Sequence, residues 1–233
     1  MANLKQLKSE LKKLANKKQA KILAGFFKTG IGQYGAGDIF LGIKVPVQRI
    51  TAKKYCNLAL KDLQKLLDTK IHEYRLIALM ILLFQYKKAE VLSKEKIIDF
   101  YLKNTRNINN WDLVDLSCQY ILGDYLLDKP RKILYKLAKS KNIWEKRIAI
   151  ISTFAFIKNK EFGDTLKISK ILLHDKHDLI HKAVGWMLRE AGKRDQAVLE
   201  YFLQKNFKTM PRTMLRYAIE KLSKQKRKFY LNK

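Results

Sequence analysis

Apolar residues recur three and four positions apart along almost the whole chain, which is the spacing of one face of an α-helix. The pattern predicts one or two basic amphipathic helices over residues 3–28 and many further helices after residue 45. The expected ranges are 46–58, 60–68, 71–88, 93–108, 111–127, 130–140, 143–158, 162–173, 178–191, 195–206 and 211–222. No segment gives a convincing strand pattern. We therefore expect an all-α fold.

Residues 29–45 are the longest segment without this pattern. Six of the ten glycines lie between residues 25 and 42, and Pro46 suits the first turn of the helix that follows. The stretch from Gly30 to Gly35 matches G-x-G-x-x-G, a pattern found in dinucleotide-binding folds. A helix pattern precedes it, however, and no βαβ unit follows. We interpret this segment as a turn-rich loop.

Short segments of similar sequence repeat along the helical part of the chain. Each segment has an anchor residue that is followed, two and three positions later, by small or apolar residues. The anchors are 36, 36, 35 and 34 residues apart, at Arg75, Trp111, Arg147, Lys182 and Arg216. A period of about 35 residues with two helices in each unit is typical of an α-solenoid.

The anchor and the residue four positions later share one face of each helix. These pairs are Arg75 and Leu79, Trp111 and Asp115, Arg147 and Ile151, Lys182 and Trp186, and Arg216 and Glu220. In a curved solenoid the equivalent faces of the inner helices line the concave surface. The pattern thus predicts a concave groove that carries basic and aromatic side chains, which suits nucleic acid.

Charge points to the same class of partner. The chain has 49 Lys and Arg against 21 Asp and Glu, a formal net charge of +28. Such an excess favours nucleic acid first and an anionic membrane second, because cationic side chains neutralise phosphates and release counterions. A Lys-rich composition without a specific partner is the plain alternative. The expected location is cytoplasmic, since no signal peptide and no apolar run of about 18 residues is evident.

Metal or disulfide chemistry receives little support from the sequence. Cys56 and Cys118 are too few for a disulfide framework or a cysteine-based zinc site. His174, His177 and His181 lack the H-E-x-x-H spacing of zinc enzymes, so we interpret them as loop histidines. We expect no metal and no organic cofactor.

Four segments carry a resemblance to a known family. They are residues 41–46 (LGIKVP), 110–115 (NWDLVD), 144–150 (WEKRIAI) and 182–190 (KAVGWMLRE). In these segments, from about residue 30 onward, the chain resembles the AlkD-type DNA glycosylases of the DNA alkylation repair family. The resemblance implies a superhelix of HEAT-like repeats with a concave basic groove. We expect one domain over residues 1–233, with basic helices and the Gly-rich loop in 1–45 and repeats in 46–233.

The resemblance also implies an activity. It is hydrolysis of the N-glycosidic bond of alkylated purines, chiefly N3-methyladenine and N7-methylguanine, without a base-binding pocket. By this likeness Asp115 is the catalytic carboxylate, Trp111 and Trp186 pack on the DNA backbone around the lesion, and Arg147 and Arg189 contact DNA. The partner is then duplex DNA with alkylated bases, and we expect a monomer without an obligate protein partner.

These residue types agree with that chemistry, and other roles remain open for them. A carboxylate stabilises the positive charge that develops on the deoxyribose, and an indole face attracts a cation. Lys182 and Arg216 are further DNA-binding candidates because they are anchors. Asp115 could instead cap a helix or pair with a lysine, and Trp111 and Trp186 could be core residues. A HEAT-like scaffold that binds nucleic acid or protein without chemistry is the alternative function.

Overall fold

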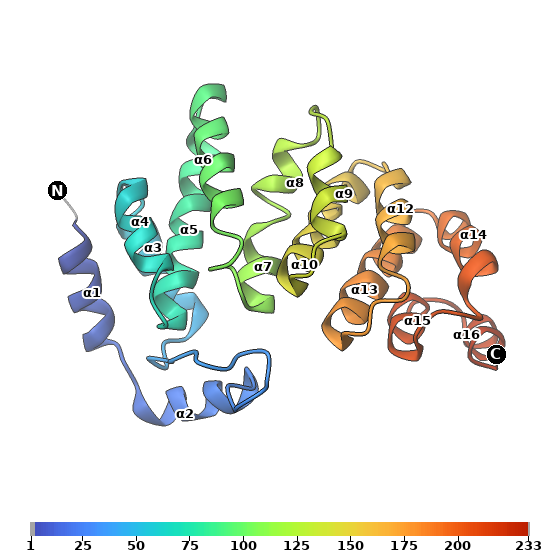
Figure 1. Cartoon of the computed structure of the whole chain (residues 1–233), viewed down its shortest axis with the longest axis horizontal. Coiled ribbons are helices and arrows are strands. Elements are labelled where there is room, and N and C mark those ends of the chain that lie inside the picture. The colour runs from blue at the N-terminus through green and yellow to red at the C-terminus, as the bar shows by residue number, and fades with distance from the viewer. Residues whose placement is uncertain (1–2, 233) are drawn as a thin grey trace. The chain divides into compact units, whose positions relative to one another are not determined.

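The computed structural model describes residues 3–232 and consists of helices joined by turns and loops (Figure 1). Within these residues the only β-type pairing is one isolated parallel bridge between Ile39 and Ile71. The prediction of an all-α fold is confirmed. The chain divides into two compact units, residues 1–117 (unit 1) and residues 118–233 (unit 2). A single domain over the whole chain stays a prediction, and each unit is described by itself.

Unit 1 begins with two basic helices and continues with the first helix pairs. Its helices are α1 (Leu4–Lys13), α2 (Lys17–Phe26), α3 (Val45–Lys54), α4 (Leu60–Leu67), α5 (His72–Lys88), α6 (Val91–Lys103) and α7 (Trp111–Ser117). The basic stretch divides in two because Asn16 caps a second helix, its side chain accepting from the backbone NH of Gln19. Residues 29–44 are non-helical as predicted, and Pro46 lies in the first turn of α3.

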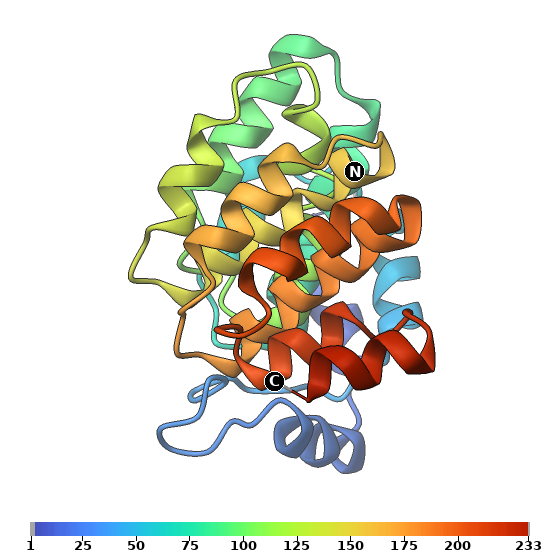
Figure 2. The same cartoon turned by 90° about the vertical axis from the view of Figure 1, so that its right-hand side faces the viewer.

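Unit 2 contains the remaining helices. They are α8 (Leu122–Tyr125), α9 (Lys132–Ala138), α10 (Ile143–Ser152), α11 (Phe154–Lys158), α12 (Gly163–Ile171), α13 (Asp178–Arg194), α14 (Gln196–Asn206), α15 (Arg212–Ala218) and α16 (Lys224–Leu231). The single helix predicted over 111–127 is wrong, because residues 118–121 form turns between α7 and α8. Helix α16, dark red in Figure 2, lies beyond the predicted helices. Buried Tyr230 anchors it, with its ring 5.4 Å from the ring of Phe207.

The predicted repeat is confirmed by the position of its anchors. All five lie on the second helix of a pair, namely on α5, α7, α10, α13 and α15. The residues two and three positions after each anchor are buried. Helix α7 packs on α5 in unit 1, and α13 packs on both α10 and α15 in unit 2. The small and apolar positions of the repeat therefore mark the faces where the second helices meet their neighbours.

Gly185 shows how closely α13 and α15 approach. A Cβ atom at this position would lie 2.5 Å from the carbonyl oxygen of Met214 and 2.5 Å from Cβ of Tyr217. We expect Gly185→Ala to lower the free energy of unfolding by about 1–3 kcal/mol, because the two helices must move apart. Urea denaturation measures the effect.

Gly163→Ala is the matched control, since a Cβ atom at Gly163 would meet nothing within 4 Å. This substitution reduces only the conformational freedom of the unfolded chain. The free energy of unfolding should therefore stay constant or rise by up to about 1 kcal/mol. Equal losses in the two variants would contradict the close approach of α13 and α15.

Candidate functional site

Helix α7 carries the predicted tryptophan and carboxylate of unit 1. It begins at Trp111, whose backbone NH donates to the side-chain oxygen of buried Asn110 at 2.8 Å. Asp115 lies one turn later, and both side chains are half-buried. Residues four positions apart on a helix share a face. The two predicted residues are therefore together on one face of α7, partly open to solvent.

Aromatic side chains from the N-terminal segment surround Trp111. The Phe27 ring stacks on the indole, with centroids 5.2 Å apart and planes at 22°, and the Phe26 ring meets it edge-on at 5.9 Å. The indole Nε1 donates to the hydroxyl of Tyr34, 3.2 Å away, from within the Gly-rich loop. The helical and charge patterns of the sequence do not point to these three residues. The doublet Phe26-Phe27 directly before a glycine-rich segment was the available signal.

A buried histidine connects α7 to two other segments of unit 1. His72, the first residue of α5, is 2% exposed. Its Nδ1 lies 3.1 Å from Oδ2 of Asp38, and its Nε2 lies 2.8 Å from Oδ2 of Asp112. Both ring nitrogens can donate only when the ring is protonated. Burial alone would lower the pKa of His72, but the hydrogen bonds with Asp112 and Asp38 outweigh it and raise the pKa to about 9.

A second cation completes this cluster. The guanidinium of Arg75 forms an ion pair with Asp38 at 2.7 Å and donates to the side-chain oxygen of Asn109 at 2.8 Å. Burial would raise the pKa of Asp38, but His72 and Arg75 outweigh it and lower this pKa. Arg75, the anchor of the first repeat, is therefore buried in a network of charges. We call Asp38, His72, Arg75 and Asp112 the buried charge cluster.

Glu73 fixes the end of the Gly-rich segment to α5. Its carboxylate accepts hydrogen bonds from the backbone NH groups of Leu41, Gly42 and Ile43, at 2.9, 2.8 and 3.2 Å. Gly42 has a φ of +83°, and a Cβ atom there would collide with the carbonyl oxygen of Asn16. Only glycine suits this position. The segment 41–46 thus has a structural role, because it ties the end of the Gly-rich segment to the start of α5.

In unit 2, α13 carries Lys182 and Trp186 one turn apart. The Trp186 ring is half-buried, and its centroid lies 6.0 Å from that of Phe154. The Lys182 ammonium forms an ion pair with Asp178 at 2.7 Å. Arg216 on α15 is exposed. These three side chains reach the surface of unit 2, as a DNA-contacting role requires.

The two other predicted arginines of unit 2 are held by protein groups. Arg147 is 5% exposed and donates to the carbonyl oxygen of Leu179 at 2.6 Å, which ties α10 to the start of α13. Arg189 forms an ion pair with Glu220 of the predicted strip. A contact of either arginine with DNA stays a prediction.

Two aliphatic residues of the predicted groove strip lie in the core, and its anchors Arg75 and Arg147 are buried as well. Leu79 and Ile151 are fully buried, so the expectation that every residue four positions after an anchor lines a groove is wrong. Both side chains are aliphatic and gain more from burial than from an exposed face.

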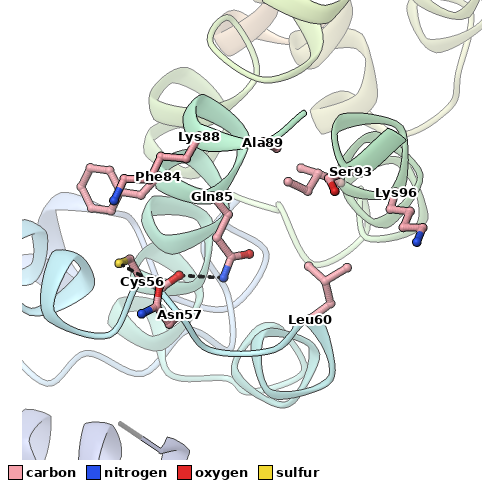
Figure 3. Close-up of a pocket in the computed structure, with 10 residues that line it drawn as sticks. Cys56, Asn57, Leu60, Phe84, Gln85, Lys88, Ala89, Ser93 and Lys96 are labelled. Atoms are coloured by element: carbon pink, nitrogen blue, oxygen red, sulfur yellow. Dashed lines mark hydrogen bonds between the residues drawn. The ribbon is translucent and has the colours of Figure 1, made fainter. Parts of the chain in front are cut away.

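Away from α7, unit 1 has a pocket of about 380 Å³ at the C-terminal end of α5. Its lining includes Phe84 and Lys96, and the Gln85 amide donates to the carbonyl oxygen of Cys56 there (Figure 3). The same amide also donates to the carbonyl oxygen of Leu58. Neither Trp111 nor Asp115 lines it. Over residues 3–232 we find no group of His, Cys, Asp and Glu suited to hold a metal ion, and no helix long and apolar enough to span a membrane.

Residues 7–222 match the model of the DNA alkylation repair enzyme family. The chain belongs to this family. Its fold is also similar to a solved structure from Enterococcus faecalis, described as a predicted DNA alkylation repair enzyme. The two chains are 16% identical with a TM-score of 0.70, and the match covers 90% of this chain and 97% of that one. No curated protein sequence matches the chain.

The buried charge cluster makes the stability of this DNA alkylation repair protein depend on pH. The folded pKa of His72, about 9, lies above its ordinary value of 6.5, so the stabilisation is complete below pH 6.5 and is lost as the pH rises through 9. We expect the free energy of unfolding to fall by on the order of 3 kcal/mol across this window. Urea denaturation at a series of pH values measures it.

His72→Gln is the control for this pH dependence, because it removes the titrating group. Its unfolding free energy should change much less between pH 6.5 and 9. Identical pH slopes for the wild type and this variant would show that another group is responsible. The lowered pKa of Asp38 acts at the other end of the scale, where stability is lost as the pH falls below 3.8.

Proposed function

We propose that this protein is a DNA glycosylase that hydrolyses the N-glycosidic bond of cationic alkylated purines, such as N3-methyladenine and N7-methylguanine, in duplex DNA. The observation that carries the proposal is the pairing of Trp111 and Asp115 on one partly open face of α7, in a chain of the DNA alkylation repair family. The net charge of +28 supports a polyanionic substrate.

The proposed reaction follows from the charge of the lesion. An alkylated purine is cationic, so it leaves as a neutral base when the bond to C1′ breaks and takes the bonding electron pair. Positive charge then develops on the deoxyribose, and the Asp115 carboxylate stabilises it. The same carboxylate orients the water that adds to C1′, and the proton that this water loses passes to the solvent. Because the leaving base needs no protonation, one carboxylate suffices.

Trp111 supports this reaction through its indole face. An aromatic face attracts a nearby cation by about 0.5–2 kcal/mol, depending on desolvation. The stacking of Phe27 and the hydrogen bond to Tyr34 hold the indole in one orientation before substrate arrives. A ring that is already oriented loses less conformational entropy on binding. The aromatic cluster thus favours a role of Trp111 at the lesion.

Unit 2 contributes contacts to the DNA backbone in this proposal. Lys182 and Arg216 supply positive charge at the surface, and Trp186 offers an aromatic face for the sugar-phosphate chain. Arg189 is a weaker candidate because a DNA phosphate must compete with Glu220 for its guanidinium. Arg147 acts first as a link between α10 and α13 through the Leu179 carbonyl.

Replacement of the proposed catalytic carboxylate gives the direct test. We expect Asp115→Asn to lower the rate of N7-methylguanine release from methylated duplex DNA by about 100-fold or more, because the charge that stabilises the transition state is lost. The thermal unfolding midpoint should change little, since the side chain is half-buried and the two residues have the same shape. Chromatographic detection of the released base measures the rate.

Asp99→Asn serves as the control, because Asp99 is an exposed carboxylate on α6. It should excise at the wild-type rate. Release of N7-methylguanine by Asp115→Asn at the wild-type rate would falsify the proposed mechanism.

Arg216→Gln tests the proposed DNA contacts of unit 2. Loss of one phosphate contact should reduce the slope of log affinity against log salt concentration by about 0.9. Fluorescence anisotropy with an undamaged duplex measures this slope. Arg212→Gln removes the same charge from the same helix, but the Arg212 guanidinium is engaged by the carbonyl oxygen of Leu231. Equal slope changes in both variants would reflect net charge alone and would remove Arg216 from the interface.

A further inference from the structure

We propose that His72 is a positioning residue for base excision, because its ring joins the start of α7 to the Gly-rich segment and thereby sets the places of Trp111 and Asp115. The effect on excision rests on the proposed function. The connection between His72 and α7 itself rests only on the structure of unit 1.

Helix α7 is held to α5 by the side chain of Asp112, and this link is the first support for the proposal. This helix has seven residues, a length at which an isolated helix is unstable in water. One carboxylate oxygen of Asp112 accepts from the backbone NH of Leu113 at 2.8 Å, and the other accepts from Nε2 of His72 at 2.8 Å. A single side chain thus joins the first turn of α7 to α5. A displacement of Asp112 moves Trp111, its neighbour, and Asp115, one turn further on.

The second support is that the same ring packs beneath the tryptophan. His72 stacks on Phe40 with ring centroids 4.6 Å apart and contacts Phe27 at 4.9 Å. Phe27 in turn stacks on Trp111 at 5.2 Å. His72 therefore acts on Trp111 by two routes, through the backbone of α7 and through the Phe27 ring.

The third support is the balance of charge around the ring. The charged groups that face His72 are Asp112 from α7, Asp38 from the Gly-rich segment and, through Asp38, Arg75 from α5. Two cations and two carboxylates therefore compensate one another in a buried site. Loss of the His72 proton leaves one carboxylate without a charged donor, which is costly in a buried environment. Asp112 is the more exposed carboxylate of the two and is the one that can turn toward water.

Two substitutions separate a positioning role from a merely structural one. The amide nitrogen of a glutamine at position 72 can take the place of Nε2 and donate to Asp112, whereas that of an asparagine can take the place of Nδ1 and donate only to Asp38. Both variants lose the buried charge, so both should be less stable than the wild type. Only His72→Asn releases the start of α7.

We expect His72→Asn to excise N7-methylguanine about 100-fold more slowly than the wild type, as for a displacement of the reacting groups by about 1 Å. His72→Gln should stay within about tenfold of the wild-type rate. The loss should appear in the single-turnover rate constant at saturating enzyme. The affinity for undamaged DNA should stay constant. Equal excision rates for the two folded variants would overturn the proposal.

A second measurement needs no DNA. In a Trp144→Phe, Trp186→Phe background the only indole is Trp111, and Tyr34→Phe removes the phenol that it contacts. We expect the emission of Trp111 and its quenching by acrylamide to change with a midpoint near pH 9, and this change to vanish in both His72 variants. A signal that is constant from pH 7 to 10 would overturn the link between His72 and α7. If the wild type releases no alkylated base, the proposed function fails, and this titration still decides the link.

Discussion

The arrangement of unit 1 depends on a buried cation held between two carboxylates. His72 meets Asp38, 34 residues earlier in the chain, and Asp112, 40 residues later. Removing a charge from water is expensive, and the expense is offset only when each charge finds well-placed partners. In this cluster Asp38 and Asp112 accept hydrogen bonds from the protonated His72 ring, and Arg75 forms an ion pair with the other carboxylate oxygen of Asp38. Three segments distant in sequence therefore meet at one point, and Trp111 directly precedes Asp112 of this cluster in the chain.

The second helices of unit 2 are brought together by a different means. Helix α13 approaches α15 closely because Gly185 has no side chain, and α10, whose Ile150 is fully buried, packs on α13. Contacts of this kind are close-packed and tolerate little change in volume. Polar links are added where a helix begins, as in the bond from Arg147 to the Leu179 carbonyl. Packing thus sets the spacing of these helices, and the polar links set where they start.

The helical repeat could be predicted from the sequence because its determinants are local. Small and apolar residues recur at a fixed distance from each anchor, and all of these positions are buried. The environment of the anchors could not be predicted in the same way. Arg75 and Arg216 occupy equivalent positions, yet Arg75 is buried since Asp38 reaches it from the Gly-rich loop, whereas Arg216 is exposed. The partners of an anchor lie tens of residues away, and the repeat pattern carries no information about them.

The proton on His72 resembles a bound ligand of the folded chain. Many proteins join two carboxylates with a divalent cation, whose supply varies and which a chelator can remove. Here the protonated His72 ring joins Asp38 to Asp112 in place of a metal ion, and water supplies the proton. With a pKa of about 9 the ring stays protonated throughout the neutral range, so this ligand is almost always bound. The Trp111 face is thereby held together by a proton, and water, which surrounds any protein, supplies that proton.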